Sequence, residues 1–274
     1  MKILKAQFKK GFTLIELLIV IAVVGVLGTG VLVAIDPAGK INSANIAKAE
    51  TFSAGIQNNL AIDLVGEWTF DDGTFKDTSG NGNNGMGINV TPALDRRNRN
   101  KASNFNGTAY IDAGNRTSLK PDVFTVEAWI KWQSGIYWPL VSFSASGLPA
   151  ILPVWTAGRS LIYLGAGNFK YFFHNPVNIA DGNWHHLVFI VTGNGQNDID
   201  NAKMYADGRI QIADTIAKTG LPNSKTGPLY IGFFSGYYAN GLIDDVRIYK
   251  QALTFSQIQQ LYAQGLIKHL LAFK

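Results

Sequence analysis

One stretch limits the possible folds of this chain more than any other. From Phe12 to Ile35 the residues are almost all apolar, and the only charged side chain among them is Glu16. At about 1.5 Å per residue, a helix of this length exceeds the roughly 30 Å hydrocarbon core of a bilayer. Residues 12–35 are therefore predicted to form a helix that spans a membrane.

The residues before this stretch are basic and end in a glycine. Gly11 directly precedes Phe12, and four lysines come earlier: Lys2, Lys5, Lys9 and Lys10. An ordinary signal peptide has a shorter apolar run followed by its cleavage site, so the order here is reversed. With the run GFTLIELL (residues 11–18), this order resembles the type IV prepilin family. The resemblance implies that residues 1–11 are a leader, that a prepilin peptidase cleaves between Gly11 and Phe12, and that the new amine of Phe12 is methylated.

Glu16 lies inside the apolar segment, where a carboxylate without a partner costs several kcal/mol. In the pilin family the equivalent acid pairs with the methylated N-terminal amine of a neighbouring subunit in a filament. The resemblance therefore implies that Glu16 meets the amine of a neighbour's Phe12, and that residues 12–35 also form a filament core. The alternative is a simple anchor helix whose glutamate reaches the membrane interface.

Residues 36–64 are predicted to form an amphipathic helix and a linker. Asp36 followed by Pro37 is typical of a helix N-cap and first helical position. A narrow apolar stripe then recurs at multiples of about one turn: Ile41, Ala49, Phe52, Ile56 and Leu60. The stripe should face either the protein's own globular part or a neighbouring subunit.

Charge is concentrated at the N-terminus. Lys and Arg number 24 against 19 acids, and four of the 24 precede Phe12, so the rest of the chain has 20 bases and 19 acids. A nearly neutral body is not typical of a nucleic-acid-binding domain, and no such partner is expected there. The chain has no cysteine, which excludes thiolate catalysis and a Cys-based zinc site.

From Val65 onward, short aromatic and β-branched runs alternate with Gly, Asn and Asp clusters, as in an all-β sandwich. Strands are expected at 124–132, 184–193, 203–210, 228–234 and 241–249, with Asp207-Gly208 as a hairpin turn. A C-terminal helix is expected from Thr254, which forms a capping box with Gln257, to a C-cap at Gly265.

The ordered segments of this body resemble the concanavalin A-like, laminin-G-like jelly-roll family over residues 65–265, leaving a tail at 266–274. The resemblance rests on VGEWTFDDGTFKDTSGNGNNG (65–85), KASNFNGTAYIDAG (101–114), FTVEAWIKW, NWHHLVFIVTG, MYADG and GLIDDVRIYKQALTFSQIQQLY (241–262). The expected fold is mainly β: a long N-terminal pilin-like helix, then a two-sheet antiparallel jelly-roll sandwich with a short C-terminal helix.

The loop DTSGNGNNG (77–85) can aim several oxygens inward, as Ca²⁺ requires. Family members often hold calcium between this loop and the acid that opens the last long strand, which implies Asp77, Asn81, Asn83 and Asp244 as ligands. Asp244 shares strand parity with Val246 and Ile248 and is expected to point to the interior. The alternative is a hydrogen-bonded loop without metal.

Four aromatic residues in the middle of the body are candidates for stacking on sugar rings, with core packing as the alternative: Trp132, Tyr137, Trp138 and Trp155. His185 and His186 are neighbours on one strand, so they should point to opposite faces and cannot share one metal. The acid pairs Asp71-Asp72 and Asp244-Asp245 give no two carboxylates that face each other across a cleft, so catalysis is not expected.

These features predict a pilin-like subunit, minor or at the tip because its head is large, that displays a laminin-G-like domain to a glycan or surface protein. The head would lie outside the cytoplasm, on the cell surface or on a filament. The alternatives are a pseudopilin of a secretion or DNA-uptake system, a membrane-tethered glycan-active enzyme, and a domain that uses its helix only as a tether.

Overall fold

The structure is a computed structural model that describes residues 60–96, 99–144, 149–156, 158–165, 167–193, 198–218 and 225–267. The chain divides into two units, Met1–Asn58 and Asn59–Lys274, and every described residue belongs to the second. The predicted leader (1–11), the predicted membrane helix (12–35) with Gly11, Phe12 and Glu16, and most of segment 36–64 lie outside the described residues. Within the described ranges, no helix has both the length and the apolarity to cross a membrane.

Two antiparallel eight-stranded sheets face each other. Sheet A has the order β13-β12-β11-β6-β18-β4-β3, and β1 also pairs with β18. Its strands are β1 (Leu64–Trp68), β3 (Thr91–Leu94), β4 (Asn100–Asn106), β6 (Val123–Trp132), β11 (Trp184–Thr192), β12 (Lys203–Ala206), β13 (Arg209–Ile210) and β18 (Asn240–Tyr249).

Sheet B has the order β14-β10-β9-β8-β7-β15-β5-β2. Its strands are β2 (Met86–Ile88), β5 (Tyr110–Asp112), β7 (Val141–Ser142), β8 (Ala150–Thr156), β9 (Arg159–Gly165), β10 (Asn168–Phe173), β14 (Ala213–Lys218) and β15 (Tyr230–Ile231). A separate hairpin joins β16 (Phe233–Phe234) to β17 (Tyr237–Tyr238). Among the described residues, 60–63 are helical, and the other helices are η2 (Thr117–Leu119), η3 (Asp198–Asn201) and α3 (Phe255–Ile267).

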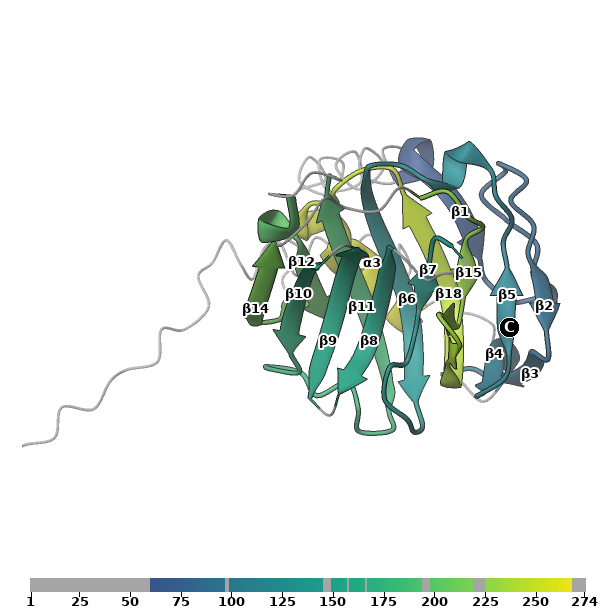
Figure 1. The fold of residues 1–274 in the computed structure, drawn as a ribbon. Coiled ribbons are helices and arrows are strands. Elements are labelled where there is room, and N and C mark those ends of the chain that lie inside the picture. The colour runs from purple at the N-terminus through teal and green to yellow at the C-terminus, as the bar shows by residue number, and fades with distance from the viewer. Residues whose placement is uncertain are drawn as a thin grey trace, which may run out of the picture. The chain divides into compact units, whose positions relative to one another are not determined.

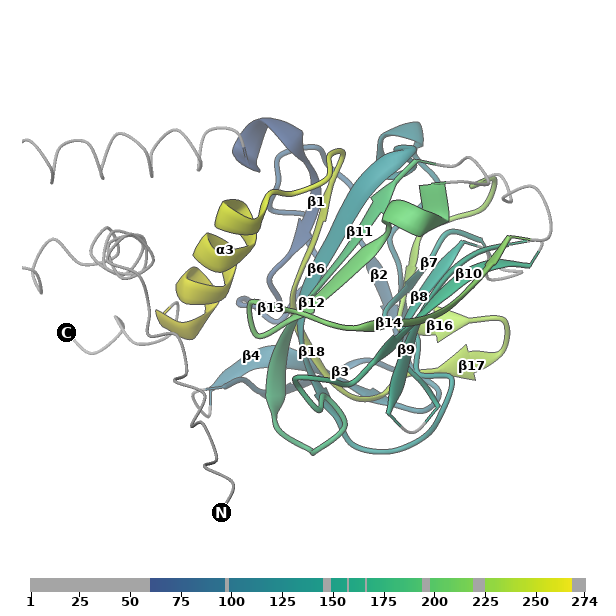
Figure 2. The same cartoon turned by 90° about the vertical axis from the view of Figure 1, so that its left-hand side faces the viewer.

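The elements form layers. Figure 1 views the sandwich from the side of sheet B, with β8, β9 and β10 in front and α3 behind. Figure 2, turned by 90°, shows α3 on one side of sheet A and the β16–β17 hairpin on the far side of sheet B. A two-sheet antiparallel sandwich with a short C-terminal helix is thereby confirmed.

The main hydrophobic core lies between the sheets. Strand β6 shows why: Phe124, Val126, Ala128 and Ile130 are all buried in this core, since alternate residues of a strand share one face. The other face of β6 is buried as well, with Thr125 and Glu127 fully covered. The strand predicted at 124–132 is therefore an inner strand, paired with β11 and β18.

Most predicted strands form, but segment 228–234 does not run continuously. Gly232 has φ +81° and separates β15 from β16, so the chain leaves sheet B there. The predicted hairpin turn is confirmed, since Asp207 and Gly208 both have positive φ (49° and 71°).

Helix α3 begins at the predicted capping box but ends later than predicted. The backbone N–H of Thr254 donates to Gln257 Oε1 at 2.8 Å, and the backbone N–H of Gln257 donates to Thr254 Oγ1 at 3.3 Å. Gly265 lies inside the helix, so its predicted role as C-cap is wrong. A Cβ there would lie 2.3 Å from Trp129 Nε1. Glycine is needed because α3 closely approaches sheet A.

Candidate functional site

The outer face of sheet B, turned away from sheet A, carries a strip of aromatic side chains. We define this aromatic strip by six residues: Tyr137, Trp155, Tyr163, Phe169, Tyr171 and Tyr237. The first five are partly buried against a small apolar cluster on the same face, and Tyr237 on the β16–β17 hairpin is 45% exposed. The strip therefore presents rings to solvent from a rigid base.

Ring contacts join the strip into a continuous surface. Tyr137 lies between Tyr237 and Trp155, with ring centroids 4.7 Å and 4.4 Å away. Trp155 is 6.4 Å from Tyr171, which is 5.0 Å from Phe169. The path crosses from the β16–β17 hairpin over β8 to β10.

Strand alternation explains this placement. In β9, Ile162 and Leu164 lie in the main core, which places Tyr163 between them on the outer face. In β10, Phe172 lies in the core and its neighbour Tyr171 lies in the strip. Aromatic residues at outward positions give sheet B an apolar outer surface.

An ion pair lies at the β10 end of the strip. The guanidinium carbon of Arg159 is 6.0 Å from the ring centroid of Tyr171 and 5.3 Å from that of Phe173. Its Nη2 is 2.9 Å from Asp214 Oδ2 on β14. The apolar surface of the strip thus ends beside a pair of opposite charges.

Of the four aromatic residues predicted from the sequence, only Tyr137 and Trp155 belong to the strip. Trp138 is 1% exposed in the main core, and its Nε1 donates to the carbonyl oxygen of Asn240. Trp132 packs against the same core, with Nε1 donating to the carbonyl oxygen of Gly135. For Trp138 the ligand-binding prediction needs correction, because its side chain is buried in the main core and no ligand can stack on it.

The sequence analysis missed Tyr163, Phe169, Tyr171, Tyr237, Arg159 and Asp214. A signal was present in NFKYFF (168–173), where Phe169, Tyr171 and Phe173 occupy alternate positions. That pattern shows that two faces exist, but it does not show which face is covered. The ion pair has no sequence signal, since its partners lie on different strands.

The predicted calcium loop is held by hydrogen bonds. Asp77 Oδ1 accepts from the backbone N–H of Glu67 and Ser79, at 3.0 and 2.9 Å, and its Oδ2 accepts from that of Asn83 at 2.7 Å. The side-chain amide of Asn81 donates to the carbonyl oxygen of Leu64. These bonds match the metal-free alternative, although Asn83 Oδ1 is buried with no hydrogen-bond partner. Calcium stays a prediction.

Asp244 is fully buried, as expected, but on the α3 side of sheet A and not between the sheets with Val246 and Ile248. The residue lies beside Trp129 in the register of β18 and β6, whereas Arg247 lies beside Glu127, so β18 contains one extra residue between these points. Asp245, with φ 51°, lies within this β-bulge. The bulge reverses the alternation, which turns Asp244 to the α3 side while Val246 enters the core.

On the α3 side, Arg96 binds both acids of this bulge. Its Nη1 is 2.9 Å from Asp244 Oδ2, and its Nη2 is 2.9 Å from Asp245 Oδ2. The guanidinium also lies 4.2 Å above the ring of Trp129 and donates to the carbonyl oxygen of Gly265 at 3.4 Å. Asp244, the predicted fourth calcium ligand, is therefore already paired with the positive charge of Arg96.

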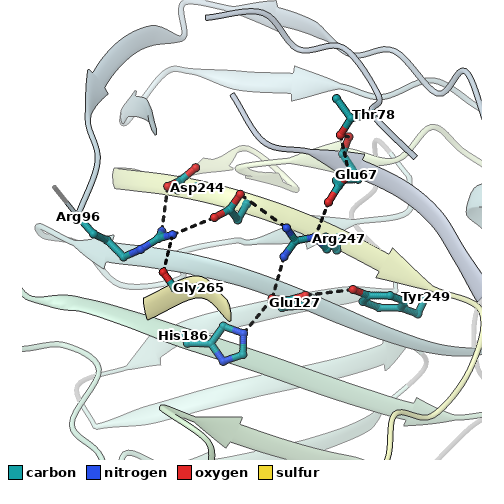
Figure 3. Close-up of polar contacts among 10 residues, drawn as sticks. Glu67, Thr78, Arg96, Glu127, His186, Asp244, Arg247, Tyr249 and Gly265 are labelled. Atoms are coloured by element: carbon teal, nitrogen blue, oxygen red, sulfur yellow. Dashed lines mark hydrogen bonds and ion pairs between the residues drawn. The ribbon is translucent and has the colours of Figure 1, made fainter. Parts of the chain in front are cut away.

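A buried polar network continues from this point under α3 (Figure 3). Glu127 Oε1 is 3.1 Å from Arg247 Nη1 and 3.0 Å from His186 Nε2, and Glu127 Oε2 accepts from the hydroxyl of Tyr249 at 3.3 Å. Burial alone would raise the pKa of Glu127, but Arg247 and His186 outweigh it and lower that pKa. Burial, with Glu127 nearby, raises the pKa of Tyr249. The network keeps Glu127 ionised in the interior.

His185 points the other way, as predicted for neighbouring strand residues, and lies between two carboxylates. Within the described residues, no group of three or more His, Cys, Asp or Glu side chains could hold a metal ion. The acids of the bulge bind one arginine, whereas a glycoside hydrolase needs two carboxyl groups roughly 5 to 9.5 Å apart across a cleft.

Comparison with family models gives two matches. Residues 105–259 match the model described as the concanavalin A-like lectin/glucanases superfamily. Residues 7–32 match the prokaryotic N-terminal methylation motif, so both predicted resemblances are confirmed. No curated protein matches the chain.

Solved structures share the fold at low sequence identity. Domain 4 of AbnA, a GH43 extracellular arabinanase from Geobacillus stearothermophilus solved with arabinotriose, has a TM-score of 0.52 and 22% identity over 73% of this chain and 98% of that one. Botulinum neurotoxin type C, whose cell entry depends on interaction with two ganglioside molecules, has a TM-score of 0.56 and 13% identity over 76% and 53%. The binding domain of botulinum neurotoxin DC, solved with rat synaptotagmin II, has a TM-score of 0.54 and 14% identity over 75% and 52%. The match thus spans about half of each toxin chain.

Proposed function

The chain belongs to the concanavalin A-like lectin/glucanases superfamily, and we propose that it is a pilin-like subunit whose β-sandwich binds a glycan through the aromatic strip. The observation that carries the proposal is the strip itself. Sugar rings have apolar faces that stack on aromatic rings, and Trp and Tyr add polar groups at the ring edge. Half-buried rings on a rigid sheet can stack with little loss of conformational entropy.

Similar solved structures support a binding role. One was solved with arabinotriose, one belongs to a toxin whose cell entry depends on interaction with two ganglioside molecules, and one was solved with rat synaptotagmin II. The ligands of these three proteins are consistent with a glycan or a protein as the ligand of this domain. The aromatic strip favours a glycan, because sugar rings stack on aromatic rings. In this proposal the domain is a binding module and not an enzyme.

The filament part of the proposal rests on the methylation motif at residues 7–32. A prepilin peptidase would cleave between Gly11 and Phe12, and helix 12–35 would enter the membrane and then pack against other pilin-like subunits. Glu16 would pair with the methylated amine of a neighbour's Phe12. The head would lie outside the cytoplasm, and its size suits a minor or tip subunit. A pseudopilin of a secretion or DNA-uptake system would share this processing.

Binding is tested by titrating the full chain, in detergent, with oligosaccharides of arabinose, galactose and glucose. We expect at least one to bind, and Trp155→Ala to weaken that binding at least tenfold while the fold is unchanged by circular dichroism. The matched control is Phe255→Ala, which removes an aromatic side chain that is 58% exposed on α3. Equal binding by both variants would refute the role of the strip.

Processing is tested by intact-mass analysis of the protein from its native membrane and from sheared filaments. We expect a chain that begins with N-methylated Phe12 and is recovered with filaments. A mass that retains residues 1–11, found only in membranes, would leave a tethered domain instead.

A further inference from the structure

The Arg159–Asp214 pair lies at the β10 end of the aromatic strip, next to the place that a ligand on the strip would occupy. Arg159 is the first residue of β9. Its guanidinium lies over the rings of Tyr171 and Phe173 on β10 and forms an ion pair with Asp214 on β14. Tyr171 belongs to both the ring path and this contact. The side chain of Arg159 is 44% exposed and that of Asp214 is 17% exposed. Because Asp214 Oδ2 is buried, a ligand would meet this carboxylate at Oδ1.

The pair presents hydrogen-bonding capacity without net charge. The ion pair joins Nη2 of Arg159 to Oδ2 of Asp214 at 2.9 Å, so the two charges offset each other. A guanidinium has five N–H donors and a carboxylate has about four acceptor sites, which leaves donors and acceptors side by side. A hydroxyl group both donates and accepts, so adjacent sugar hydroxyls can bind both partners at once.

An acidic sugar would fit this pair poorly. Its carboxylate could accept from Arg159 but would come close to Asp214, and charges of like sign placed together are strongly unfavourable. A site can select one ligand by such repulsion of another as well as by attraction. Asp214 therefore acts against anionic ligands while it supports the position of Arg159.

We infer that the Arg159–Asp214 pair makes the aromatic strip specific for neutral sugars with adjacent hydroxyl groups. This inference rests on the proposed function and adds the class of glycan to it. Arg159 donates to one hydroxyl, Asp214 accepts from its neighbour, and the rings of Trp155 and Tyr171 stack on the sugars.

The test uses the full chain in detergent and hexasaccharides of galactose and of glucose, each in the neutral form and in the form oxidised to the carboxylate at C6. For the wild-type chain, calorimetry should give a Kd for a neutral form that is at least tenfold lower than for its carboxylate form. Arg159→Gln should raise the Kd of the neutral form about tenfold, the equivalent of one missing interaction. Asp214→Asn leaves the guanidinium charge uncompensated and should shift the preference toward the carboxylate form.

The control is Lys218→Gln, because Lys218 also forms an ion pair on β14, with Asp200, outside the aromatic strip. It should leave both Kd values unchanged. Equal affinity of the wild-type chain for neutral and carboxylate forms, unaltered by Asp214→Asn, would overturn this inference and leave the proposed function standing. If none of these hexasaccharides binds, this inference is overturned; if the arabinose oligosaccharides do not bind either, the proposed function is overturned as well.

Discussion

His185 lies between two carboxylates, with Nδ1 2.8 Å from Asp207 Oδ2 and Nε2 2.9 Å from Asp181 Oδ1. Burial alone would lower the pKa of His185, but hydrogen bonds to Asp207 and Asp181 outweigh it and raise that pKa above its ordinary value of 6.5. Although partial burial opposes the charge of Asp181, its hydrogen bond with His185 lowers the pKa of Asp181 to about 2. The raised pKa of His185 and the lowered pKa of Asp181 both reflect the hydrogen bond between these two side chains.

The raised pKa sets the direction of a pH effect. A histidine whose pKa is raised on folding adds stability that is complete below 6.5 and is lost as the pH rises through the raised pKa. We expect the melting temperature to fall over that range, and His185→Gln to remove the fall. His174→Gln is the control. Burial lowers the pKa of His174, so its contribution to the pH dependence of stability has the opposite sign and its removal should leave the fall in place. Retention of the fall in His185→Gln would contradict this account.

The loop at Asp77 gives a test of calcium. Asp77 and Asn81 already have hydrogen-bond partners and Asp244 binds Arg96, so the metal-free alternative predicts that EDTA leaves the melting temperature unchanged, whereas bound calcium predicts a fall. Asp77→Ala should lower stability by about 1–3 kcal/mol, since buried backbone donors lose their acceptor. A rise in melting temperature on addition of Ca²⁺, abolished by Asn83→Ala, would support the calcium prediction.

At the level of elements, Glu127 joins three strands of sheet A, because it lies on β6, contacts His186 on β11 and contacts Arg247 on β18. Removing one partner of a buried ion pair typically costs about 3–5 kcal/mol. We expect Glu127→Gln to lower the free energy of unfolding by about 3 kcal/mol in urea titrations. Glu67→Gln is the control: it also contacts Arg247, but its side chain is 19% exposed, so its loss should be about 1 kcal/mol or less. Equal losses would argue against the role of burial.

The docking of α3 depends on Gly265. In Gly265→Ala the new Cβ would meet the indole of Trp129, which already has Tyr262 on α3 and Arg96 as neighbours. Overpacking costs about 1–3 kcal/mol, which exceeds the gain of up to about 1 kcal/mol in helix propensity. We expect a net loss of stability in denaturant titrations. Ser256→Ala, on the exposed face of α3, should cause none; a Gly265→Ala protein equal to it would show that the helix can shift freely.

At the level of the whole molecule, the second unit, Asn59–Lys274, contains the full core between the two sheets. We expect a fragment that begins at Asn59 to be monomeric and to unfold in one cooperative transition, because its buried apolar residues come from both sheets. It should also bind the same sugars as the full chain. A fragment without a cooperative transition would show that residues 1–58 are needed for folding.

The sequence alone determined the features that depend on local order along the chain. The run from Gly11 to Leu18 identified the N-terminal motif, and the aromatic and β-branched run at 124–132 identified a strand of a β-sandwich. The capping box at Thr254 and Gln257 fixed the start of α3. Such features are readable because caps, turns and strand alternation involve residues close in sequence.

Only the tertiary structure decided which faces are covered and which distant groups meet. The bulge at Asp245 reversed the orientation of Asp244, and the approach of α3 to Trp129 gave Gly265 a different role from the one predicted. The packing of the sheets buried Trp138 and left Trp155 beside Tyr137 and Tyr171 on the outer face of sheet B. The physical reason is the same in each case: one inserted residue or one neighbouring element changes a side chain's surroundings, and sequence spacing does not record either.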